Sequence, residues 1–100
     1  MNSEDRFKAF LDTLGSAKGT MRCRDTVGIL DGLGFEVRDG KKQGHKIIFH
    51  TGIPGFFSAS FTCGHGRNPE IKPAYMRQIH KLLLRYKSEI LGLLEARDEH

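Results

Sequence analysis

The residues best suited to chemistry lie between Asp39 and His50, where one histidine, His45, follows a basic turn and opens an apolar run. Lysines stand on both sides of it, at Lys41, Lys42 and Lys46. An imidazole exchanges protons near neutral pH, and nearby cations stabilise phosphate, so the group can act on a phosphodiester. The pattern therefore predicts that His45 is a general acid or base. The alternative is that His45 is simply a surface histidine at a strand end.

RNA is the substrate that needs the fewest catalytic groups at such a site. Its 2′-hydroxyl is a nucleophile within the substrate, so one base and cationic stabilisation of the phosphate are enough to begin cleavage. The sequence does not identify the group that protonates the leaving oxygen; His50 and His65 are the candidates.

A metal site is a weaker hypothesis. His45, His50, Cys63 and His65 could gather around one ion, and Cys63-Gly64-His65 is the suggestive part. Zinc sites usually show paired CxxC or HxxxH spacings, which are lacking here, and Cys63 falls on the apolar register of its segment. The sequence therefore predicts no metal ligands and a buried cysteine.

Length, charge and cysteine content bound the class of protein. A chain of 100 residues is one domain, and its net charge of +4 favours an anionic partner such as nucleic acid. Two cysteines and no secretory leader indicate a reducing cytoplasm and no disulfide. No apolar run approaches the length of a membrane span.

The helical segments are expected at the two ends and before the basic turn. A short amphipathic helix is expected from Ser3 to Gly15, and its apolar stripe needs a partner in the body of the domain or in another subunit. This leaves residues 1–19 as an N-terminal helix and linker, with the main fold over 20–100. A second helix is expected at about 23–33, and a long one from Pro73 to about Ala96, with a break within 88–92. The terminal helices could pair in a homodimer.

Three short strands fill the middle of the chain. Segments 35–38, 45–50 and 57–63 are bounded by turn residues, and short connections predict neighbouring antiparallel strands. The order predicts an α+β fold, helix–strand–strand–strand–helix with a three-stranded antiparallel sheet, as in double-stranded-RNA-binding domains, plus the extra N-terminal helix. Ile47-Ile48-Phe49 is apolar on both faces, so alternation does not decide the side on which His45 lies.

A basic stripe marks the last helix. Arg77, Lys81 and Arg85 recur at intervals of four, so they share one helix face. The stripe could bind nucleic acid or an acidic partner protein, or it could simply be solvated.

Several local motifs together resemble the HicA-type toxins of bacterial toxin–antitoxin pairs, which are small mRNA interferases. The resemblance covers about residues 21–86 and is carried by these segments: Cys23-Arg24-Asp25, Leu33-Gly34-Phe35, Gly44-His45, Cys63-Gly64-His65 and Lys72-Pro73-Ala74-Tyr75-Met76-Arg77. The family often has Gly-Ser-His where this chain has Gln43-Gly44-His45, and its third strand often ends in Pro-x-His where Cys63 stands here.

The resemblance implies a double-stranded-RNA-binding-like fold, metal-independent cleavage of mRNA without a cofactor, and neutralisation by a cognate antitoxin protein. It implies the catalytic role for His45 only. The residues expected to bind RNA are the basic side chains Lys41, Lys42, Lys46, Arg77 and Lys81. The alternatives are a non-catalytic double-stranded-RNA-binding module and a protein-interaction module built on the terminal helices.

Overall fold

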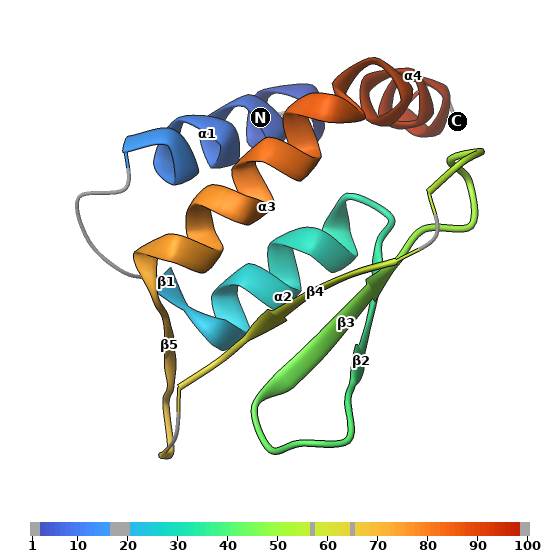
Figure 1. Ribbon diagram of the computed structural model, residues 1–100. Coiled ribbons are helices and arrows are strands. Elements are labelled where there is room, and N and C mark those ends of the chain that lie inside the picture. Colours follow the sequence, from blue (N-terminus) through green and yellow to red (C-terminus); the bar gives the residue numbers. More distant parts are fainter. Residues whose placement is uncertain (1–2, 17–20, 57, 65, 99–100) are drawn as a thin grey trace.

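The computed structural model describes residues 3–16, 21–56, 58–64 and 66–98. Within them the chain forms four helices, a three-stranded antiparallel sheet and a separate two-stranded ribbon, arranged in layers (Figure 1). The α+β class and the three-stranded antiparallel sheet expected from the sequence are confirmed.

The three-stranded sheet is a meander in the order β2-β3-β4, formed by β2 (Glu36–Asp39), β3 (His45–Phe49) and β4 (Ala59–Thr62). In the register, Asp39 lies opposite Lys46 across β2 and β3, and His45 lies opposite Thr62 across β3 and β4. Strand β2 begins one residue later and β3 ends one residue earlier than expected. The first residue expected in the third strand, Phe57, lies outside the described residues.

Helices cover only one face of this sheet. Helix α2 (Cys23–Gly32) packs on β2, and α3 (Pro73–Arg85) packs on β4. Their apolar sides meet Ile48 and Phe61 from the sheet, each about 1% exposed, in the centre of the core. We call this side of the sheet the helix-side face and the other, which no described helix covers, the open face (Figure 1).

The terminal helices pack on each other and on α3. Helix α1 (Ser3–Ser16) lies across α3 and also contacts α4 (Lys87–Asp98) (Figure 1). The stripe predicted for α1 is buried, with Phe7 and Leu14 fully inaccessible. Its partner is therefore the body of the same chain, as one of the two sequence alternatives held.

The break in the last helical segment falls earlier than expected. Helix α3 ends at Arg85 and α4 starts at Lys87, so the chain turns at Tyr86 rather than within 88–92. The Tyr86 ring packs edge-on against Phe56, with centroids 5.2 Å apart. The turn directs Ile90 and Leu94 of α4 into the core, where they are almost inaccessible.

Two features of the connections were not foreseen. Strand β1 (Met21–Arg22) pairs antiparallel with β5 (Glu70–Ile71), and both strands have only two residues. Cys23 and Cys63 form a disulfide with Cα atoms 5.7 Å apart, so the expectation of no disulfide was wrong. The fold brings the start of α2 to the end of β4, and 40 residues of separation hide this in the sequence. Both cysteines are buried, as expected for Cys63.

Candidate functional site

His45 begins β3 on the open face of the sheet. Ile48 is buried towards the helices, so strand alternation puts Lys46 on its side and His45 with Ile47 on the opposite side. Thr62, directly across the strand pair, shares the open face. A histidine that acts on RNA must be accessible to it, and His45 lies on the face that no described helix covers.

Gly40, in the turn before β3, makes room for this histidine. A Cβ atom at Gly40 would overlap Nδ1 of His45, so the imidazole lies directly against the backbone of Gly40. The same two residues are joined through the main chain, where Gly40 N–H donates to the His45 carbonyl at 2.7 Å. The sequence shows a basic turn before His45, but it does not show that the missing side chain of Gly40 sets the position of the ring.

Gly44 fixes the strand that carries the histidine. Its φ is +82°, and an added Cβ would lie 2.7 Å from the Cys63 carbonyl oxygen. The Gly44 carbonyl also accepts a 2.7 Å hydrogen bond from Cys63 N–H. Only glycine combines this backbone conformation with such a close approach of β4, so the residue before His45 has a structural reason to be glycine.

Basic side chains gather beside His45 on the open face. A shallow groove, called here the open-face groove, is lined by Lys41, Lys42, Gln43, His45, Ile47 and Thr62. Both lysines are exposed, whereas His45 is half-buried. The structure thus brings Lys41 and Lys42 together with His45, as the sequence predicted.

Lys46 is separated from that groove. It lies on the helix-side face, and its Nζ is ion-paired with Oδ1 of Asp39 across the hairpin. This position makes it unsuitable as a partner of His45 on one phosphate. Strand alternation could have placed it correctly only if the faces of β3 had been known.

Arg77 and Lys81 are exposed on α3. That helix covers the helix-side face, so these side chains belong to a different surface from His45. Their contact with RNA remains a prediction that concerns binding and not the chemical step.

His50 has the opposite environment to His45. Its Nδ1 accepts a 3.1 Å hydrogen bond from Gly52 N–H, which leaves the proton on Nε2. Nε2 is buried without a hydrogen bond of standard geometry among the described residues, and the ring packs edge-on against Phe35 at 4.7 Å. Burial lowers the pKa of His50, and the nearby backbone of Leu33 opposes the shift. On the helix side, at the far end of β3, it is poorly placed to protonate a leaving group at His45.

The remaining candidates for a metal site are Cys63 and His65. His65 lies outside the described residues, and Cys63 is occupied by its disulfide. In the part of the chain that the structure describes, no three histidine, cysteine or acidic side chains are grouped closely enough to hold an ion. Across the same residues, no helix is both long and apolar enough to cross a membrane.

Comparison with known proteins adds no family: the chain matches no protein-family model, no curated protein and no solved structure. The residues and geometry of the open-face groove are therefore the basis for a function.

Proposed function

We propose that this chain is a HicA-type mRNA interferase that cleaves RNA with His45 as its catalytic residue. The observation that carries the proposal is the placement of His45 on the open face, beside Lys41 and Lys42, in a groove open to a polymer. The order α2-β2-β3-β4, followed after the short strand β5 by α3, with both helices on one face, supports the double-stranded-RNA-binding-like architecture that the resemblance implies.

The proposed reaction is an intramolecular transesterification, in which the phosphate is transferred from the 5′-oxygen to the adjacent 2′-hydroxyl of the same RNA strand. His45 removes the 2′-hydroxyl proton, the oxygen attacks the adjacent phosphorus, and the bond to the 5′-oxygen breaks. The products are a 2′,3′-cyclic phosphate and a 5′-hydroxyl, and the leaving oxygen takes its proton from water. Because the nucleophile belongs to the substrate, the reaction needs no metal-bound water.

Lys41 and Lys42 have a distinct part in this scheme. Negative charge increases on the phosphate oxygens as the 2′-oxygen attacks, and cations already in place stabilise that charge without reorganisation. Lys42 also helps to position the base, because its carbonyl accepts a 3.1 Å hydrogen bond from His45 N–H. Lys46 has no role in this step, since it lies on the other face with Asp39.

The test is a comparison of His45→Ala with the parent. General-base catalysis contributes about 10²- to 10⁴-fold, so the variant should cleave purified RNA at least about 100-fold more slowly and should no longer arrest growth on expression. Circular dichroism should show the same fold for both proteins. If His45→Ala arrests growth as strongly as the parent, the ribonuclease proposal is wrong.

The proposed antitoxin has its own experiment. If a small reading frame next to the gene encodes an acidic DNA-binding protein, its co-expression should restore growth and form a stable complex with this chain. RNA binding without any cleavage by the parent would instead favour the non-catalytic RNA-binding module.

A further inference from the structure

A second groove lies on the helix-side face of the same β2–β3 hairpin. It runs between α2, the hairpin turn and the chain that follows β4. Its charged lining consists of Arg24, Lys46 and Arg67, with Asp31 as the acidic side chain. We call it the helix-side groove. The reaction proposed at His45 makes no use of it.

The two grooves meet at the hairpin turn. Gln43 lines both the open-face groove and the helix-side groove, so one residue borders the two hollows. A strand lying at His45 can therefore continue over the turn into the helix-side groove. Lys41 and Lys42 would contact one side of this path, and Arg67 would contact the other.

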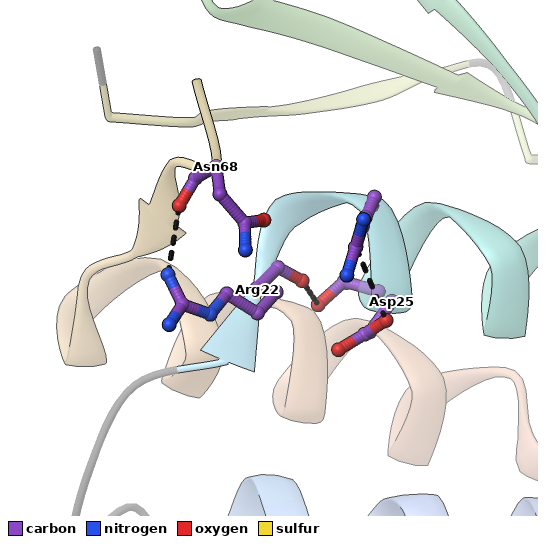
Figure 2. Close-up of polar contacts among 5 residues, drawn as sticks. Arg22, Asp25 and Asn68 are labelled. Atoms are coloured by element: carbon purple, nitrogen blue, oxygen red, sulfur yellow. Dashed lines mark hydrogen bonds and ion pairs between the residues drawn. The ribbon is translucent and has the colours of Figure 1, made fainter. Parts of the chain in front are cut away.

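The wall that carries Arg67 is held in place by the surrounding backbone. Arg22 donates from Nη1 to the Asn68 carbonyl at 2.9 Å (Figure 2). Cys23 N–H donates to the Pro69 carbonyl, also at 2.9 Å. These contacts tie the segment after β4 to the start of α2, so the exposed Arg67 extends from an anchored wall.

The lining of the helix-side groove also exposes main chain. Gly44, Gly64 and Gly66 contribute to it, and a Cβ at Gly66 would meet no atom within 4 Å. Lining without side chains lets a ligand approach the backbone closely. Together with the arginines, this suits the chain of phosphates and sugars of a nucleic acid better than a small apolar molecule.

We propose that the helix-side groove binds the phosphodiester backbone of the RNA segment next to the one that lies at His45. The proposal rests on the proposed function for the identity of the ligand, and it extends the substrate site around the hairpin turn. Lys46 is half-buried and ion-paired with Asp39, and Arg24 Nε lies 4.0 Å from Asp25 Oδ1. Because both carboxylates are largely exposed to solvent, these ion pairs contribute little, and a phosphate can replace either carboxylate.

Arg67 and Asp31 provide opposite tests of this groove. In the His45→Ala background, binding of an uncleaved single-stranded RNA is measured by fluorescence anisotropy over a series of salt concentrations. Each phosphate contact on a single strand contributes about 0.7 to the salt exponent, so Arg67→Ala should weaken binding about fivefold near 0.1 M salt. Asp31→Asn should strengthen binding, a gain that damaged folding does not produce.

Matched controls separate the groove from the general charge of the protein. Arg6→Ala and Asp12→Asn make the same charge changes on exposed positions of α1. The proposal expects the two controls to leave both the affinity and the salt exponent close to those of the background. It is overturned if Arg67→Ala binds like Arg6→Ala and Asp31→Asn binds like Asp12→Asn.

The design also distinguishes this proposal from the ribonuclease proposal. All four variants are scored by binding in a protein without His45, so the result does not depend on catalysis. A parent that never cleaves RNA, with the expected Arg67 and Asp31 effects, refutes only the ribonuclease. A parent whose cleavage requires His45, with no such effects, refutes only the helix-side groove.

Discussion

His45 and His50 stand at the two ends of β3 on opposite faces, five positions apart. His45 lies against Gly40 on the open face, in a groove lined with lysines. His50 lies against Phe35 on the helix side, with Nδ1 bonded to Gly52 N–H and Nε2 buried. Residue type is the same, so the difference comes from the face of the sheet. On the open face the imidazole lines a groove with lysines, and on the helix side it packs against Phe35.

The largest expected effect concerns the helix-side face, where the Cys23–Cys63 disulfide lies. In the chain-entropy model a crosslink that spans about 40 residues stabilises a fold by about 4 kcal/mol. In urea unfolding of the parent, dithiothreitol should lower the free energy of unfolding by about this amount. The Cys23→Ser, Cys63→Ser double variant should be insensitive to dithiothreitol. An unchanged unfolding midpoint in protein that thiol titration shows to be reduced would contradict this assignment.

The next effect compares two glycines with the same backbone conformation. Gly44 and Gly55 have φ values of +82° and +83°, but only Gly44 has a backbone atom close to its absent Cβ. Gly55→Ala should therefore cost about 1 to 2 kcal/mol from conformation alone. Gly44→Ala should cost at least about 1 kcal/mol more, because the new methyl group overlaps the Cys63 carbonyl. If chemical denaturation showed equal losses of unfolding free energy for the two variants, the close approach of Gly44 to the Cys63 carbonyl would not contribute to stability.

A smaller effect should appear in catalysis and leave stability nearly unchanged. Gly40→Ala places a methyl group where the His45 ring lies, so the ring must turn while the backbone stays in place. We expect cleavage to fall about tenfold, equivalent to about 1.4 kcal/mol in the barrier, mainly through kcat.

Gly32→Ala is the matched control for Gly40→Ala. Gly32 is exposed at the end of α2, and an added Cβ there meets no atom within 4 Å. This change should stabilise the helix by up to about 1 kcal/mol and leave cleavage unchanged. If the two variants cleave equally well, Gly40 does not position the imidazole.

The smallest effect is the pH dependence that His50 confers. Its folded pKa is below the ordinary value of 6.5, because burial disfavours the charged ring. The unfolded chain therefore binds the proton more readily than the folded protein does. The contribution of His50 to stability is complete above about pH 6.5 and declines as the pH falls towards the folded pKa. Chemical denaturation at about pH 8 and pH 5 should show a weaker decline in His50→Gln than in the parent. Identical declines would remove His50 as a source of this dependence.

The sequence predicted most of the local structure because local signals specify it. Turn residues delimited β3, proline marked the start of α3, and helical spacing identified the buried side of α1. The break at Tyr86 was misplaced because the apolar spacing continues through it, and the Tyr86 ring contacts Phe56, which is distant in the sequence. The Cys23–Cys63 pairing and the two-stranded ribbon of β1 and β5 also depend on contacts remote in the sequence.

The candidate site was predictable in its composition but not in its geometry. The sequence placed Lys41, Lys42 and Lys46 around His45 as one group. The register separates Lys46 from the others, and the apolar run 47–49 concealed that separation because both faces look alike. The contact between Gly40 and the imidazole could not be inferred without the path of the turn.

The disulfide has a further consequence for local unfolding. It closes the chain between Cys23 and Cys63 into a covalent ring that contains β2, β3, β4 and every residue of the open-face groove. Helices α1, α3 and α4 lie outside this ring. If the terminal helices separated in a partial opening, the disulfide would still join the end of β4 to the start of α2. Amides of β3 should therefore exchange with solvent more slowly than those of α4, and reduction should narrow that difference.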